Sequence, residues 1–195
     1  MSLETAKTAL ERLGYQVELF ATAREAADYL DAALDGKTIG FGGSMTLEEM
    51  DLYERLRTHN TVYSHLHGYP AGPDAATAQI YLTSVNGLAE TGEIINIDGI
   101  GNRVSGTLYG HEKVIFVVGR NKVAPTYDEA LWRARNIAGP KNARRKKLNT
   151  PCAAKADRCY NCKSPDRICR ALVVLWEALM NMPMEVVLVD EDLGY

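Results

Sequence analysis

Four cysteines, the only ones in this 195-residue chain, lie within eighteen residues of each other. They are spaced C-x6-C-x2-C-x6-C, at Cys152, Cys159, Cys162 and Cys169. Four thiolates around a central C-x2-C can enclose one zinc ion or anchor one 4Fe–4S cluster. The spacing is neither the paired C-x2-C of a zinc ribbon nor the C-x2-C-x2-C run of bacterial ferredoxins. It therefore predicts a metal centre without choosing the metal, and unligated or disulfide-paired thiols are the competing interpretation.

The composition of the chain favours the ligand interpretation. Residues 1–10 contain Glu4 and Lys7 and no apolar run, and no stretch approaches the roughly 20 apolar residues of a membrane span. We therefore expect a cytoplasmic protein, in which clustered cysteines are more often metal ligands than disulfides. A net charge of −3 gives no reason to expect nucleic-acid binding. The basic run 144–147 is either a solvated helix end or a charge that stabilises an anionic thiolate site.

A second candidate site is glycine-rich and follows an expected strand over 38–41. Gly42, Gly43, Ser44 and Thr46 fall where this strand would end and a helix would begin. Glycine lets backbone N–H groups approach a ligand, and a helix N-terminus favours an anion such as phosphate or carboxylate. The segment has neither the G-K-[ST] of a Walker loop nor the third glycine of G-x-G-x-x-G. It predicts an anion site, with a plain turn capped by Ser44 or Thr46 as the alternative.

Further polar candidates occur between residues 83 and 103. Glu90 is a candidate catalytic base or nucleophile, and its alternative role is that of a turn residue. Arg103 has a planar fork suited to holding a carboxylate through two hydrogen bonds, although it could simply pair with Asp98. Three more residues in loops that follow expected strands complete the predicted anion-binding set: Asn86, Asn102 and Lys122.

Two smaller groups of residues carry weaker signals. His59, His65 and His67 lie close together in the sequence and could bind a metal, but no carboxylate completes the set. We therefore expect them at loop edges without a metal. Trp132 and Trp176 occur at helical spacing and are expected to pack in the core.

Helical and strand patterns alternate along the chain and predict an α/β fold with a mainly parallel sheet. Helices are expected over 2–13, 22–34, 46–57, 74–79, 128–138 and 171–180. Strands are expected over 15–20, 38–41, 61–64, 80–85, 93–98, 103–108, 113–119 and 185–189. The pair 93–98 and 103–108 is expected to form an antiparallel hairpin. We expect one domain over residues 1–195, with a four-cysteine loop at 150–170.

Several of these motifs together resemble the LUD domain family. The resemblance covers roughly residues 35–170, and the G-N-R and G-x-N-K elements are its most specific parts. The matching stretches are G-G-S-M-T (42–46), T-S-V-N (83–86), E-T-G (90–92), D-G-I-G-N-R (98–103), V-G-R-N-K (118–122), the segment 129–140 and T-P-C (150–152).

The resemblance implies a fold similar to the sugar-isomerase and CoA-transferase superfamily, a doubly wound sheet with an added antiparallel element. Segment 39–46 is similar to the phosphate loop of ribose-5-phosphate isomerases in that superfamily. Members of the LUD family are linked to the oxidation of L-lactate to pyruvate, together with iron–sulfur partner proteins. The resemblance thus implies a subunit of a lactate or related organic-acid oxidation system, which would bind a small carboxylate or phosphorylated ligand.

Two functions therefore compete. In the first, the four cysteines hold a 4Fe–4S cluster that passes electrons in an oxidoreductase. In the second, the chain is an isomerase- or transferase-like enzyme, or a regulatory binding module, with a structural zinc and with Glu90 as base or nucleophile. Because zinc has no redox chemistry, the identity of the metal discriminates between them.

Overall fold

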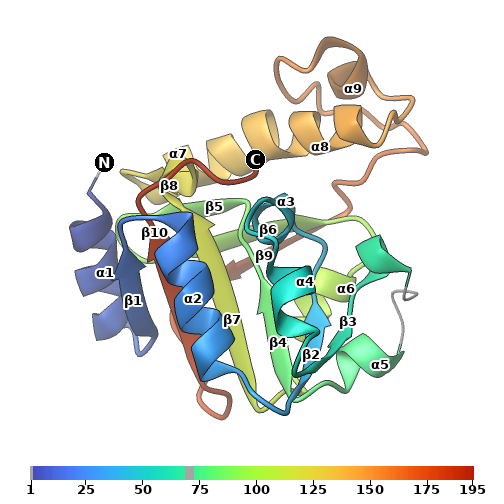
Figure 1. The fold of residues 1–195 in the computed structure, drawn as a ribbon. Coiled ribbons are helices and arrows are strands. Elements are labelled where there is room, and N and C mark those ends of the chain that lie inside the picture. Colours follow the sequence, from blue (N-terminus) through green and yellow to red (C-terminus); the bar gives the residue numbers. More distant parts are fainter. Residues whose placement is uncertain (1, 69–72) are drawn as a thin grey trace.

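The main sheet has six strands, all parallel, in a computed structural model that describes residues 2–68 and 73–195. In spatial order the strands are β1 (Gln16–Phe20), β10 (Met184–Val189), β7 (Lys113–Gly119), β4 (Ile80–Thr83), β2 (Thr38–Phe41) and β3 (Thr61–Tyr63) (Figure 1). The central strands β7 and β10 are runs of valine, isoleucine, leucine and phenylalanine that are buried on both faces. Such continuous apolar runs are typical of parallel strands covered on two sides.

Three helices cover one face of this sheet: α2 (Ala23–Ala33), α3 (Met45–Glu49) and α4 (Leu52–Leu56) (Figure 1). Leu30, Leu47 and Leu56 from these helices share one apolar cluster with Ile115 and Val187 of the sheet. Helix α2 begins with a capping box between Thr22 and Glu25, which satisfies backbone N–H groups at its start. Helix α1 (Leu3–Arg12) packs on the opposite face.

A second sheet also covers that opposite face. Its spatial order is β8 (Val123–Ala124), β5 (Gly87–Ala89), β6 (Ile94–Asp98) and β9 (Ala171–Leu175). β5 pairs with β8 in parallel, whereas β6 pairs with β5 and β9 in antiparallel fashion. Leu88 and Ile94 pack with Phe116 of the main sheet, and Ala130 and Ala134 cover the outer side of the second sheet.

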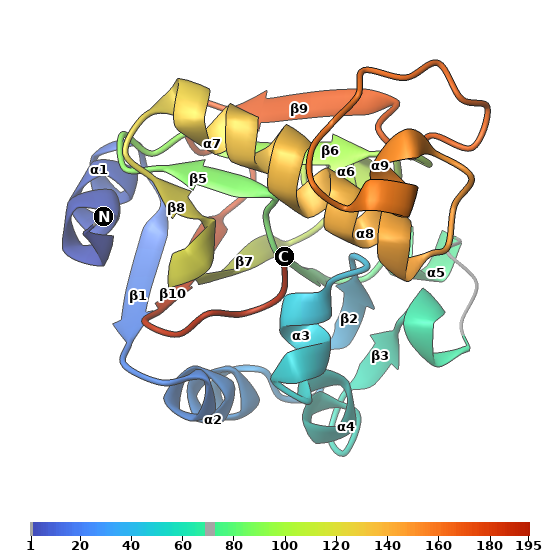
Figure 2. The same cartoon turned by 90° about the horizontal axis from the view of Figure 1, so that it is seen from above.

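The segment from α7 to α9 lies above the carboxyl ends of the main strands (Figures 1 and 2). Helix α7 (Tyr127–Arg133), the π-helical stretch η3 (Ala134–Ala138) and helix α8 (Gly139–Arg145) follow one another directly, and α9 (Pro151–Lys155) packs on α8. The other short elements are η1 (His65–His67), α5 (Pro73–Ala76), α6 (Asn102–Gly106) and η2 (Arg120–Lys122). The C-terminal residues end in the same region (Figure 2).

The α/β alternation and the strands of the main sheet were predicted correctly, but two element types were wrong. Segment 103–108 forms helix α6 instead of a strand, because the Asp98 carboxylate accepts the first N–H groups of that helix, from Arg103 and Val104. Segment 171–180 begins with strand β9, which pairs with β6, instead of a helix. The antiparallel hairpin is β5–β6 and lies in the second sheet, so the main sheet is wholly parallel.

Two finer expectations also failed. The helix expected over 46–57 is divided into α3 and α4 because Asp51 adopts a left-handed conformation (φ 53°). Trp132 and Trp176 are 59% and 72% exposed, so neither is a core residue. None of the helices in the described part of the chain has the length and apolar character needed to cross a bilayer.

Candidate functional site

A cavity of about 330 Å³ opens between the strand ends and the overhanging α8–α9 region. Gly43, His65 and Arg103 line its lower part, and helix α8 and the cysteine loop line the rest. All four cysteines contribute to its wall. The cavity is in the size range of small-molecule sites. The cysteine loop and the predicted anion site therefore share one cavity.

The structure divides the predicted anion-binding residues into two groups. Four of them line the cavity: Gly43, Asn86, Asn102 and Arg103. The other four are not among the described cavity-lining residues: Gly42, Ser44, Thr46 and Lys122. Ser44 accepts a hydrogen bond from the N–H of Leu47 (3.4 Å) and caps helix α3, as the turn interpretation predicted. The glycine loop thus contributes Gly43 to the cavity and directs its hydroxyls elsewhere.

Asp98 builds the turn that carries Arg103. Its Oδ1 accepts the backbone N–H groups of residues 99–101 at 2.6–3.1 Å, and its Oδ2 accepts those of Arg103 and Val104 at 3.0 and 3.1 Å. Burial raises the pKa of Asp98, but these N–H groups and the nearby Arg103 charge outweigh it, so the pKa lies below its ordinary value. Asp98 is therefore an ionised structural carboxylate whose oxygens are occupied by backbone donors.

Among the described residues, the hydrogen-bond partners of the Arg103 side chain are all neutral oxygens. Its NH2 group donates to the carbonyl of Gly43, and its NH1 group faces Asn86 Oδ1 (3.4 Å) and Asn96 Oδ1 (3.5 Å). Its Nε is buried without a hydrogen-bond partner. In residues 2–68 and 73–195, no carboxylate forms an ion pair with this guanidinium. Because arginine stays charged in proteins, Arg103 brings a positive charge to the cavity wall that Asp98 offsets through space without forming an ion pair.

Lys122 is a second buried cation with neutral partners. Its Nζ donates to Thr46 Oγ1 (2.8 Å), Ser84 Oγ (2.9 Å) and the carbonyl of Val85 (3.2 Å). Burial, together with the charges of Arg133 and Arg103, holds the pKa of Lys122 well below its ordinary value. Burial without a carboxylate partner therefore destabilises the protonated form of this amine and favours the neutral form.

The C-terminal residues cover Lys122 and Thr46. The carbonyl of Leu193 accepts a hydrogen bond from Thr46 Oγ1 (3.3 Å), and Asn121 bonds both the N–H of Leu193 and the carbonyl of Gly194. A Cβ built on Gly194 would lie 2.7 Å from Thr46 Oγ1 and 3.3 Å from Lys122 Nζ. Glycine is thus needed where the tail crosses this hydroxyl and amine.

The four cysteines are held by polar contacts that are partly directed at sulfur. Cys159 Sγ accepts hydrogen bonds from Arg135 NH2 (3.8 Å) and from the N–H of Asn161 (3.4 Å). Thr150 Oγ1 lies 3.3 Å from Cys152 Sγ. All four thiols are free. Among the described residues, however, no three histidine, cysteine, aspartate or glutamate side chains lie close enough to hold a metal ion. The sulfurs as placed here therefore do not form a ligand set.

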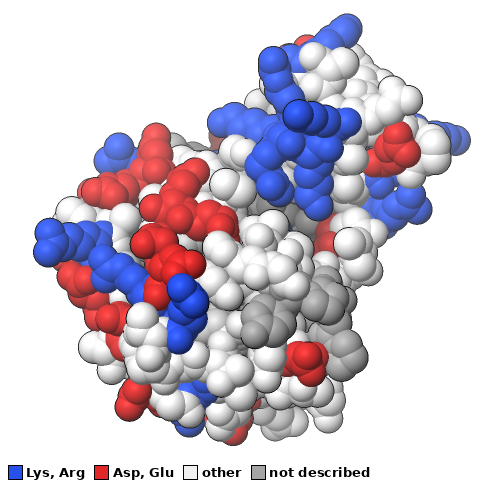
Figure 3. All heavy atoms as spheres, turned by 45° about the vertical axis from the view of Figure 1, so that its right-hand side comes forward, with Lys and Arg blue, Asp and Glu red and all other residues white. Residues whose placement is uncertain are grey.

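Positive charge is concentrated around the cavity. Residues 133–170 contain twelve of the chain's 22 lysines and arginines but only two of its 25 acidic residues. Figure 3 shows these blue side chains on the upper lobe, with the red acidic side chains mainly on the body below. Six cations line the cavity: Arg103, Arg135, Arg145, Lys146, Arg167 and Arg170. None of the six takes part in an ion pair with a described carboxylate, whereas Lys7, Arg55 and Lys113 elsewhere do.

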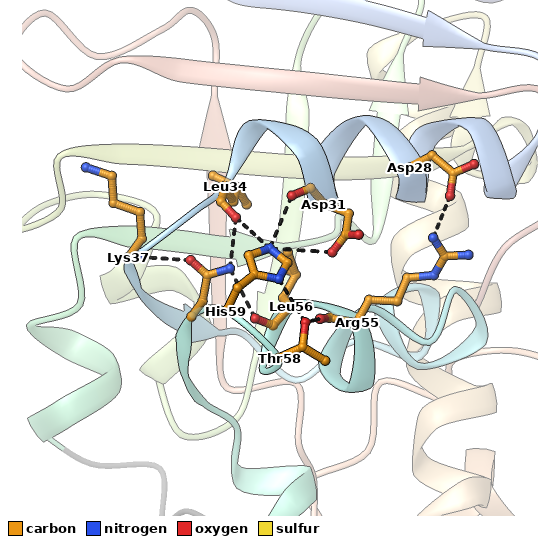
Figure 4. A network of polar contacts seen from close by, with 9 residues as sticks. Asp28, Asp31, Leu34, Lys37, Arg55, Leu56, Thr58 and His59 are labelled. Atoms are coloured by element: carbon orange, nitrogen blue, oxygen red, sulfur yellow. Dashed lines mark hydrogen bonds and ion pairs between the residues drawn. The ribbon is translucent and has the colours of Figure 1, made fainter.

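The three candidate histidines and Glu90 occupy different environments. His65 lines the cavity. His67 bonds Glu48 Oε2 (2.9 Å) and stacks on Tyr53 at 3.8 Å between ring centroids. His59 contacts the carbonyls of residues 31 and 34 at 3.2 and 3.0 Å and so closes the end of α2 (Figure 4). Glu90 accepts the N–H of Ser2 (2.6 Å) and is not among the described cavity-lining residues.

Sequence reasoning named Arg103 and the basic run 144–147, but it missed Arg135, Arg167 and Arg170 of the cationic lining and set aside His65. The signal for the cations was present in the uneven distribution of charge over residues 133–170, which the net charge of −3 conceals. His65 could not be selected in this way, because its role depends on contact with Gly43, more than twenty positions earlier. A Cβ on Gly43 would lie 2.6 Å from His65 Cε1, so glycine is what lets the ring approach the loop.

Comparisons with known proteins agree with this architecture. A family model described as the LUD domain matches residues 3–189. The search of curated proteins finds no match. Among solved structures, a DUF162 family protein from Deinococcus radiodurans is similar, with 15% sequence identity and a TM-score of 0.56, over 96% of this chain and 95% of that chain. At this identity the structural likeness establishes the fold alone. Because the family model spans nearly the whole chain, the chain belongs to the LUD domain family, which is associated with lactate utilization.

Proposed function

We propose that the chain binds a small organic anion in the cavity as a component of an L-lactate or related organic-acid oxidation system. The observation that carries this proposal is Arg103, a charged guanidinium on the cavity wall with no carboxylate partner in the described chain. An unpaired buried charge is costly, and a bound anion would offset that cost. The lactate assignment itself rests on membership of the LUD family.

Within this proposal, this chain's residues have distinct tasks. Arg103 would grip the carboxylate of the ligand, with Asn86 and Asn102 beside it on the same wall. Asp98 fixes the turn that carries Arg103, and the Gly43 carbonyl fixes the direction of the guanidinium. The α8–α9 overhang would restrict the access of water, which strengthens the interaction between the guanidinium and the anion.

The experiment is a calorimetric titration of L-lactate and pyruvate into the wild-type protein, Arg103→Gln and Arg24→Gln. Arg24 is an exposed arginine on α2 and serves as the matched control. We expect R103Q to weaken binding by at least tenfold, the loss of about 1.4 kcal/mol, while R24Q leaves it unchanged. Equal affinity of R103Q and wild type, or no binding of either acid by wild type, would overturn the proposal.

A metal centre on the four cysteines is the second part of the proposal. It is supported by the position of all four cysteines on one cavity wall and by the two N–H donors directed at Cys159 Sγ. Donors of this kind tune metal-bound thiolates. Because the sulfurs are not gathered in the described chain, the loop would have to draw them together around the ion. Iron–sulfur partner subunits, which membership of the family suggests, belong to the same proposal.

The test of the metal centre is the metal and acid-labile sulfide content of protein purified without oxygen, with its visible spectrum. Iron and sulfide in equal amounts, with a brown chromophore, would place the chain in an electron-transfer role. Stoichiometric zinc in a colourless sample would favour the alternative, a binding module or non-redox enzyme with a structural ion. A protein that holds neither would remove the metal centre and leave the anion cavity standing.

A further inference from the structure

His65 is one of the residues that line the cavity. Its imidazole lies directly against the glycine loop, since a Cβ on Gly43 would fall 2.6 Å from His65 Cε1 and 2.9 Å from Nε2. In the described chain, the ring has neither a hydrogen bond nor an ion pair, in contrast to His67, which bonds Glu48. Steric contact with the glycine loop therefore positions the ring of His65, and its two nitrogens remain available to a ligand.

Charged groups from three elements face His65. Lys146 and Arg145 come from the end of α8 and Arg103 from α6, while Glu48 of α3 is the acidic group. Burial, then the charges of Lys146, Arg103 and Arg145, lower the pKa of His65, and Glu48 opposes them. Since the ordinary pKa of histidine is about 6.5, the ring is neutral at pH 7.

The cations that line the cavity outnumber its described carboxylates, six against Asp98 and Asp166. Arg145 donates only to Asn142 Oδ1 (3.2 and 2.9 Å), and Lys146 has no side-chain partner among the described residues. Asp98 attracts Arg103 through space but forms no ion pair with it, and its oxygens accept five backbone N–H groups. A carboxylate of single charge would balance one of these cations and leave an excess. A doubly charged group fits this arrangement better.

We propose that His65, Arg103 and Lys146 form a subsite for a doubly charged oxyanion group of the ligand, and that binding of this group places a proton on His65. The inference rests on the proposed anion cavity and specifies the charge of the ligand. A phosphate ester, a sulfate and a pair of adjacent carboxylates share this chemistry. The proton comes from solvent and stays on the imidazole, which then donates a hydrogen bond to an oxygen of the anion.

The sign of the linkage follows from these charges. Burial and the neighbouring cations lower the pKa of His65, and a dianion bound beside the ring raises it. Binding therefore takes up a proton at any pH between the two pKa values. The affinity for the dianion rises as the pH falls through that window and becomes constant below it.

The experiment titrates sulfate, which keeps both charges from about pH 5 to 8.5, in two buffers with different ionisation enthalpies. We expect uptake of a fraction of a proton per site and affinity about tenfold higher near pH 6 than near pH 8. His65→Gln should bind sulfate with the same affinity at both pH values and without proton uptake. His67→Gln, the control histidine, should behave as wild type.

The possible results separate a failure of the doubly charged subsite from a failure of the proposed anion-binding function. If wild type binds sulfate with no proton uptake and no pH dependence, the role of His65 is overturned. If L-lactate binds through Arg103 but sulfate does not, the doubly charged subsite fails and the proposed function stands. If neither anion binds, both fail. If phenyl phosphate and malonate are then compared in the same way, the tighter ligand identifies the source of the two charges.

Discussion

The Asp98 carboxylate accepts the backbone N–H of Arg103 at 3.0 Å, yet it forms no ion pair with the guanidinium of the same residue. The sequence D-G-I-G-N-R therefore folds so that the acid positions the arginine through its backbone and not through an ion pair with its side chain. Asp98 thus fixes the turn through hydrogen bonds to its backbone, while the guanidinium of Arg103 keeps its donors for other partners at the cavity wall.

Asp98→Asn is expected to destabilise the protein. The amide has one acceptor oxygen instead of two, and its NH2 group would face backbone donors, so the free energy of unfolding should fall by about 1–3 kcal/mol. Because the pKa of Asp98 is lowered by folding, its contribution is present above the ordinary pKa and is lost as the pH falls through the folded value. Urea unfolding between about pH 7 and pH 3 should show the two proteins converging in acid.

The control for this measurement is Asp35→Asn, an exposed acid after α2. It should leave the unfolding midpoint within error of wild type at neutral pH. If D98N unfolds at the same urea concentration as D35N, the five hydrogen bonds to Asp98 do not stabilise the turn.

Lys122→Met is expected to stabilise the protein at neutral pH by about 1 kcal/mol, because a buried amine without a charged partner is replaced by an apolar chain of similar length. Thr46 Oγ1 and Ser84 Oγ lie 3.2 Å apart and keep each other as partners. Since folding lowers the pKa of Lys122, the wild type gains stability as the pH rises through the folded value and on toward the ordinary one. The advantage of K122M should therefore shrink in alkali.

Denaturant unfolding at pH 7 and pH 9.5 checks this expectation, with Lys141→Met as an exposed control. A marked loss of stability in K122M at pH 7 would show that the three hydrogen bonds of the amine outweigh the cost of its burial.

The parts of the fold that were predictable depend on local patterns. The apolar run 113–119 and the capping residues of helix 23–33 are local signals, because each lies within a few neighbouring residues of the sequence. The second sheet was not predictable in this way, because strand β9 pairs with β6, more than seventy residues earlier. Its sequence A-L-V-V-L suits a buried helix or a strand equally well, and only the partner decides.

The same distinction holds for the candidate site. The D-G-I-G-N-R motif identifies Arg103 because acid, glycines and arginine lie within six residues. The contact between Gly43 and His65 joins segments that are distant in sequence, and so does the cavity that both of them share with α8. The cover that the tail at Leu193 and Gly194 places over Thr46 could not be read from the loop sequence for the same reason.

Gly194→Ala is expected to lift the C-terminal tail from Lys122. The new Cβ would lie 2.7 Å from Thr46 Oγ1 and 2.9 Å from its backbone N, so the tail has to move. Gly36→Ala is the matched control, because Gly36 has the same φ of +62° and nothing within 4 Å of its would-be Cβ. Both substitutions cost about 1–2 kcal/mol for the left-handed backbone, and only G194A adds the steric effect.

The readout is acylation of Lys122 by an amine reagent, followed by mass spectrometry of the peptide. Lys122 should be labelled several-fold faster in G194A than in G36A or wild type. Equal labelling in all three proteins would mean that the tail does not limit access to the amine.

Arg167→Lys is expected to loosen the cysteine loop without affecting the sheets. The guanidinium of Arg167 bonds the carbonyl of Cys162 (3.0 Å) and, through two nitrogens, that of Cys169 (3.1 and 2.7 Å). A lysine cannot reproduce this fork, so the backbones of the two cysteines lose their common anchor. Amide exchange over 156–170 and the rate of thiol labelling should both increase, while the thermal midpoint of the whole protein changes little.

Arg158→Lys is the control, because Arg158 is exposed and only stacks over Tyr160. If R167K and R158K exchange alike, the loop is held by its contacts with α8, and the fork of Arg167 is dispensable for presenting the thiols to the cavity.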